Sequence, residues 1–188
     1  MKKILLILLL LVSSFLLPKA GGQTITLHYA VQQGDINTVR EMLMNGANVN
    51  KADYLGNTAL TIAAYQDHSE IFKLLAEYGA DLDGLDRHGF TPLMICAIKG
   101  HYEIAKYLIE QGAYPDKKGK DGQTALMHAA VNFDRESNLD LVKLLVRYGA
   151  DVNIQDRFGR TALDYSGSEE IGGYLVSVGA LKGNEIKE

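Results

Sequence analysis

Apolar and polar positions along this chain follow a pattern that returns after 33 residues. Segment 53–85 opens with a polar, glycine-containing turn, continues into an apolar run with paired alanines, and closes with leucines at helical spacing before a Gly-Ala pair. Segment 86–118 repeats this order. Such spacing predicts two short amphipathic helices in each segment. The fixed period predicts a solenoid, in which each repeat buries its apolar face against its neighbours.

Residue types at the ends of the expected helices support this prediction. Threonine, a preferred N-cap, precedes the expected first helices at Thr58, Thr91, Thr124 and Thr161. Asp35 and Asn138 stand where second helices are expected to begin, and both residue types cap helices well. Glycine is expected to end the second helices in a left-handed conformation, at Gly46, Gly79, Gly112 and Gly149. Each unit is therefore predicted to form a turn, two helices joined by a turn, and a projecting hairpin.

The order of these residues resembles the ankyrin repeat, whose pattern is D-x-x-G-x-T-P-L-H-x-A-A, then G-H, I-V, L-L-L and G-A. The clearest copies begin at Asp53 and Asp86 and end with Gly79-Ala80 and Gly112-Ala113. Copies are expected at residues 23–52, 53–85, 86–118, 119–155 and 156–181. The resemblance implies an all-α solenoid of about five helix-turn-helix and β-hairpin repeats with degenerate terminal repeats. Residues 182–188 are expected to form a frayed polar tail.

Two repeats depart from the pattern in length. The fourth has 37 residues, and its four extra residues fall within 133–137, between the two expected helices. This insertion is either part of a binding face or a tolerated surface loop. The fifth repeat is three residues short and has Ser166-Gly167 where the pattern has two alanines. A shortened, polar terminal repeat is typical of a solenoid cap.

Residues 1–22 differ in character from the repeats. Lys2 and Lys3 precede an apolar stretch over 4–17, and small residues follow at 20–22. This layout predicts a secretory signal peptide, because the stretch is short for a membrane span. Cleavage after residue 22 removes three lysines, so 16 basic and 23 acidic residues remain and the net charge is −7. The expected location is periplasmic or secreted, in a bacterium, and the alternative is a scaffold tethered by an uncleaved anchor.

No spacing of residues in the chain predicts catalysis, a metal site or a cofactor. No two of the five histidines have the i, i+4 spacing of a metal-binding helix, and no glycine-rich phosphate loop is present. His28, His68 and His101 occupy positions where the pattern uses histidine to join turns, and His128 is expected to be partly buried. The single cysteine, Cys96, is expected to be a buried core thiol, with a redox thiol as the alternative.

Ankyrin repeats bind partners through hairpin tips and the outward side of the first helices, so the resemblance implies a protein-binding face here. The residues predicted to form it are Tyr54, Leu55, Asn57, Tyr65, Gln66, Arg87, His88, Phe90, Ile98, Lys99, Lys120, Asp121, Gln123, Phe133, Arg157, Phe158 and Arg160. The aromatic members are expected to anchor a partner, or to cap neighbouring hairpins instead. The predicted function is a monomeric, non-enzymatic module that binds an unidentified protein. Acidic composition argues against nucleic acid, and the rival hypothesis is an enzyme or metal protein on the same scaffold.

Overall fold

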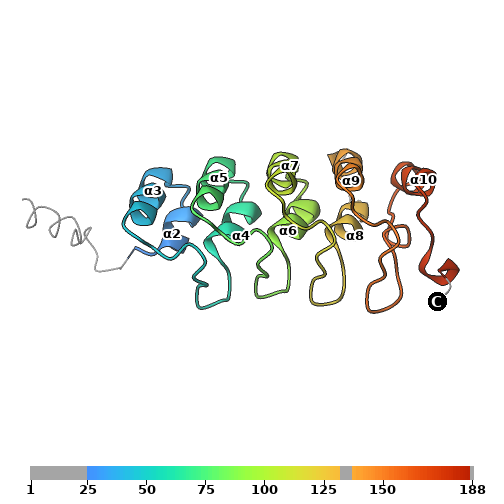
Figure 1. Cartoon of the computed structure of the whole chain (residues 1–188), viewed down its shortest axis with the longest axis horizontal. Coiled ribbons are helices and arrows are strands. Elements are labelled where there is room, and N and C mark those ends of the chain that lie inside the picture. Colours follow the sequence, from blue (N-terminus) through green and yellow to red (C-terminus); the bar gives the residue numbers. More distant parts are fainter. Residues whose placement is uncertain (1–24, 132–136, 187–188) are drawn as a thin grey trace, which may run out of the picture.

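The computed structural model describes residues 25–131 and 137–186, which form a row of stacked helix pairs (Figure 1). The helices of the first row are α2 (Leu27–Gln32), α4 (Ala59–Tyr65), α6 (Pro92–Lys99) and α8 (Ala125–Ala130). The second row consists of α3 (Ile36–Met44), α5 (Ser69–Glu77), α7 (Tyr102–Glu110), α9 (Ser137–Arg147) and α10 (Glu169–Ser177). Long loops project from one side of the stack (Figure 1). The predicted all-helical solenoid is confirmed.

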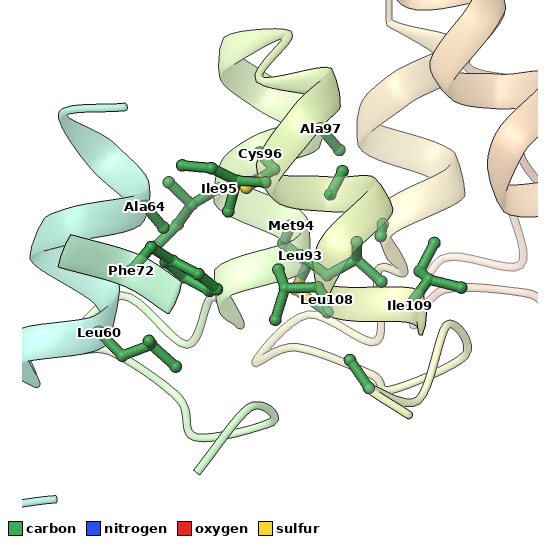
Figure 2. Close-up of a cluster of buried hydrophobic side chains, with 14 of the residues drawn as sticks. Leu60, Ala64, Phe72, Leu93, Met94, Ile95, Cys96, Ala97, Leu108 and Ile109 are labelled. Carbon is green, nitrogen blue, oxygen red and sulfur yellow. The ribbon is translucent and has the colours of Figure 1, made fainter. Parts of the chain in front are cut away.

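One continuous apolar core runs between the two rows of helices. The paired small residues of the first helices, such as Ala63 with Ala64 and Cys96 with Ala97, are buried where neighbouring repeats meet (Figure 2). Leu108 of α7 is fully buried in the same region. Cys96 is fully buried as predicted, and burial raises the pKa of its thiol well above the usual value. A thiol in this state packs as a small apolar side chain.

Threonine caps most of the first helices, as the sequence predicts. The hydroxyls of Thr58 and Thr91 accept hydrogen bonds from backbone N–H groups three residues later. Thr124 stands at the N-cap of α8 without such a bond, and Thr161 does not begin an α-helix. The Thr161 hydroxyl instead donates to the backbone oxygen of Leu181, so it joins the fifth repeat to the end of the chain.

The predicted caps of the second helices are correct at one position and wrong at another. Asp35 caps α3 by accepting a bond from the N–H of Thr38. Asn138 lies inside α9 and is buried, so it is not the cap. The helix starts one residue earlier, at Ser137. The helix therefore begins before the position that spacing from the neighbouring repeats predicts.

The loops between repeats are hairpins without a strand ladder in the described part of the chain. Each is closed by a main-chain bond, for example from the N–H of Asp53 to the oxygen of Asn57, at 2.8 Å, and from Asp86 to Phe90, at 2.9 Å. The glycines before these loops end the second helices as predicted, with φ of 84°, 80°, 92° and 90° at Gly46, Gly79, Gly112 and Gly149. The β-hairpins expected from the resemblance are therefore present as tight loops without β-strands in the described part of the chain.

The fifth repeat differs most from the pattern. Its residues 162–165 form turns instead of a first helix, and α10 alone completes the stack. The tail was predicted to fray, and this is wrong for residues 182–186. Gly183 is buried, its N–H donates to Asp164 at 2.7 Å, and its oxygen accepts from Gln155 at 2.9 Å. Gly183 thus packs against the last hairpin.

Neighbouring repeats are also joined behind the hairpins by an amide or carboxylate at an equivalent position. Asn50 accepts from the N–H of Asp81 and donates to the oxygen of Gly79, and Asn153 makes the same pair of bonds to Leu181 and Gly179. Aspartates replace asparagine at the two central junctions. Asp83 accepts from the N–H of Tyr114, and Asp116 accepts from Asp151. An ionised carboxylate cannot donate the second bond.

We expect the substitution Asp83→Asn to raise the free energy of unfolding by about 1 kcal/mol near neutral pH. Burial raises the pKa of the Asp83 carboxyl, and the nearby Asp81 raises it further. Because the folded state disfavours the ionised form, the gain should be present at neutral pH and shrink as the pH falls and Asp83 takes up a proton. Urea unfolding at several pH values measures this, and Asn50→Asp is the reverse control that should destabilise.

Candidate protein-binding face

A groove of about 970 Å³ lies between the first helices and the hairpin loops of repeats one to three. Tyrosine and aliphatic side chains from α2, α4 and the first hairpin line it, including Tyr29, Tyr54, Leu55, Ile62 and Tyr65. Tyr54 at the hairpin tip is 94% exposed, and Tyr65 at the end of α4 is 58% exposed. Rigid aromatic side chains this exposed are typical anchors of protein interfaces.

Seven of the residues predicted from the sequence line this groove. They are Tyr54, Leu55, Asn57, Tyr65, Gln66, Arg87 and His88. Asn57 serves the fold, because its N–H donates to the carboxylate of Asp53 inside the turn. Arg87 and His88 extend from the next hairpin, where the Arg87 Nε donates to the His88 Nε2 at 2.8 Å. The groove is therefore rimmed by a cation on one side and by exposed tyrosines on the other.

The next two predicted residues lie at the end of α6, beside the groove. Ile98 is 45% exposed, and the Lys99 ammonium lies 4.0 Å from the centroid of the Tyr65 ring. A cation over an aromatic face is attracted by the negative charge of that face. This contact joins the second and third repeats and fixes the direction of Tyr65. Lys99 covers only one face of the Tyr65 ring.

Phe90 does not have the place that the sequence predicts. It was expected at a position that folding does not need, but it is partly buried and packs against the core. Its ring meets His128 of α8 edge-on, with centroids 5.3 Å apart and ring planes at 85°. Phe90 is therefore part of the packing between the third and fourth repeats. The hairpin curls so that this side chain caps the next repeat, which was the alternative for the aromatic residues.

Two predicted residues of the last two hairpins, Gln123 and Arg160, belong to a separate polar network around Asp156. Its carboxylate accepts two bonds from the Arg160 guanidinium and one from the Tyr165 hydroxyl at 2.6 Å. Gln123 donates to the same hydroxyl at 2.7 Å. Burial opposes ionisation of Asp156, but hydrogen bonds from Tyr165, Arg160 and backbone N–H groups prevail and lower its pKa to about 2. Gln123 thus joins the fourth repeat to the fifth, and Arg160 orders the fifth hairpin.

The tip of the fifth hairpin remains exposed. Phe158 is 61% exposed, and the guanidinium carbons of Arg157 and Arg160 lie 4.5 Å and 4.8 Å from the centroid of its ring. Arg157 also pairs with Asp121 of the preceding hairpin at 2.7 Å. Lys120 is exposed beside this pair. Phe133, the remaining predicted residue, lies outside the described residues, as do residues 132–136 of the insertion.

Sequence reasoning missed the contribution of the first repeat to the groove. Tyr29, His28 and Lys51 line it, although this repeat was expected only to be a degenerate terminal repeat. The His28 Nε2 lies 2.8 Å from the backbone oxygen of Lys51, which confirms the predicted turn-joining role of this histidine. The available signal was Tyr29 at the repeat position of Ile62, which lines the groove from α4. The sequence of the first repeat departs from the pattern at many positions, and this hid the correspondence.

Other chemistry is sparse over the described residues. Among residues 25–131 and 137–186, no group of three or more histidine, cysteine or acidic side chains is placed to hold a metal ion. The His101 Nδ1 lies 3.7 Å from the Asp67 carboxylate, a contact that joins two adjacent turns. Within the same part of the chain, no helix has the length and apolar character needed to span a bilayer.

The stacked helix pairs, with loops that project from one side and a groove beside them, define a helical-repeat solenoid. Comparison with protein-family models matches residues 27–119 to "Ankyrin repeats (3 copies)" and residues 121–157 to "Ankyrin repeat". The chain belongs to the ankyrin-repeat family. Members of this family are generally protein–protein interaction modules and are typically non-enzymatic. A search of curated proteins found no match to this chain.

Proposed function

We propose that this chain is an exported module that binds a partner protein through the groove of its first three repeats and the adjoining hairpin tips. The observation that carries the proposal is the groove of about 970 Å³ with exposed Tyr54, Tyr65 and Tyr29 on its walls. Exposed tyrosines cost stability little in a soluble fold, but they provide rigid contact area for a partner. The stacked scaffold presents them already ordered, which lowers the entropy cost of association.

A photo-crosslinking amino acid in place of Tyr65 tests this binding face in the producing cell. We expect a covalent adduct with one partner protein at this position. The matched control is Tyr78, which is 42% exposed at the end of α5, away from the groove. Adducts that form equally at Tyr78, or that fail to form at Tyr65, would contradict the proposed face.

Export is supported by the order of charged, apolar and small residues in segment 1–22. We expect the exported protein to lack this segment, and intact-mass measurement of material from outside the cytoplasm checks it. An exported form that retains Met1 would replace the secreted module with a membrane-tethered scaffold, the alternative reading of the same segment.

A further inference from the structure

Three successive hairpins carry a cation at the same position of the turn. Arg87, Lys120 and Arg157 each occupy the second residue of their loops, and Tyr54 occupies this position in the first hairpin. All four side chains are exposed. We call Arg87, Lys120 and Arg157 the cationic row. One cation per repeat at a fixed register gives a regular line of positive charge along the hairpin tips.

The backbone of the cationic row is held in place by contacts between neighbouring hairpins. The Lys120 N–H donates to the Gly89 oxygen at 3.3 Å, and the Arg157 N–H donates to the Asp121 oxygen at 3.1 Å. A Cβ atom added to Gly89 would lie 2.5 Å from the Cβ of Lys120, so only glycine fits against this residue. The tips are thus stacked closely, and the cations project from ordered positions.

Acidic side chains in the same hairpins offset the cationic row only in part. Asp86 and Asp156 accept bonds from the backbone N–H groups of their own turns, so their charges are directed into the loops. Asp121 pairs with Arg157 at one end of the row. Without the cationic row, segment 23–188 has 13 basic and 23 acidic residues, a net charge of −10. The hairpin tips therefore concentrate the positive charge of an otherwise acidic protein.

We propose that the partner segment bound by this face is acidic and extended, with carboxylates at about every third residue. This inference rests on the proposed function and specifies its partner. Packed helices lie roughly 8–10 Å apart, and an extended chain advances about 3.3 Å per residue. A segment that crosses the tips therefore meets one cation about every three residues. Apolar residues of the same segment reach the tyrosine-lined groove next to Arg87.

Selection from a displayed library of short random peptides on the immobilised full chain tests the proposal. We expect the enriched peptides to be acidic, with glutamate or aspartate at about every third position. The double substitution Arg87→Glu with Lys120→Glu should weaken their binding about tenfold or more, because it reverses the charge that meets them. The matched control is Lys73→Glu with Lys106→Glu, which makes the same charge change on the exposed surfaces of α5 and α7.

Melting temperatures of both double variants establish that each is folded before binding is compared. Enrichment of neutral or basic peptides whose binding depends on Tyr65 would overturn the acidic partner but leave the proposed binding face in place. Equal loss of binding in the control variant would overturn the role of the cationic row. Duplex DNA that displaces the acidic peptides and shows the same dependence on Arg87 and Lys120 would assign the row to nucleic acid instead. Failure to enrich any peptide would overturn the inference, while the crosslinking at Tyr65 still tests the proposed function.

Discussion

Replacing Leu108 by alanine is expected to lower the free energy of unfolding by about 2–5 kcal/mol, the usual range for removing a buried leucine. Leu108 is fully buried in α7, in the central repeat of the stack (Figure 2). Truncation removes apolar contacts and leaves a cavity that the packed helices on both sides cannot fill. Stability in a solenoid depends on contacts between adjacent repeats, so a defect in the centre weakens two interfaces.

Urea unfolding followed by circular dichroism measures this effect. The control is Lys106→Ala on the same helix, which keeps helix propensity and alters only an exposed position. We expect the control to change stability by less than about 0.5 kcal/mol. An unchanged midpoint for Leu108→Ala would mean that α7 does not pack as the structure shows.

The second large effect is expected on acidification, through His128. Its ring is partly buried under Phe90, and its Nε2 has no hydrogen-bond partner among the described residues. Burial lowers the pKa of His128 from its ordinary 6.5 to about 4. The unfolded chain therefore binds a proton before the folded protein does as the pH falls. Stability from the neutral ring is full above about pH 6.5, declines as the pH falls, and levels off below about pH 4.

We expect this loss to amount to about 3 kcal/mol between neutral pH and pH near 4. The variant His128→Leu replaces the ring with an apolar side chain of similar size and removes the titratable group. Asp156 and Asp164 have lowered pKa values, so their protonation in acid also destabilises the fold. This effect is the same in the wild type and in the His128→Leu variant. The measurement is the difference between wild type and variant across the pH range. Parallel pH profiles would show that the His128 ring takes up a proton without disturbing the fold.

The sequence by itself determined the repeat architecture, because the same residue types at the same spacing meet the same local demands in each copy. Thr58 and Thr91 cap first helices, the glycines at the ends of second helices allow a left-handed turn, and paired alanines permit close packing. These are short-range requirements of backbone geometry and side-chain volume. These features can be predicted wherever the repeat has its regular length, and the prediction was wrong at Asn138, in the repeat that is four residues longer.

The tertiary structure decided which outward residues are free to meet a partner. Phe90 and Gln123 both lie in hairpins among exposed residues. Phe90 nevertheless packs on His128, and Gln123 donates a hydrogen bond to Tyr165 of the next repeat. The tail is likewise polar in sequence, but Gly183 is hydrogen-bonded to Asp164 and Gln155. Such contacts depend on how each loop curls against the next one. The folded stack therefore shows which loop residues are used, since Phe90 packs against the next repeat while Tyr54 projects into solvent.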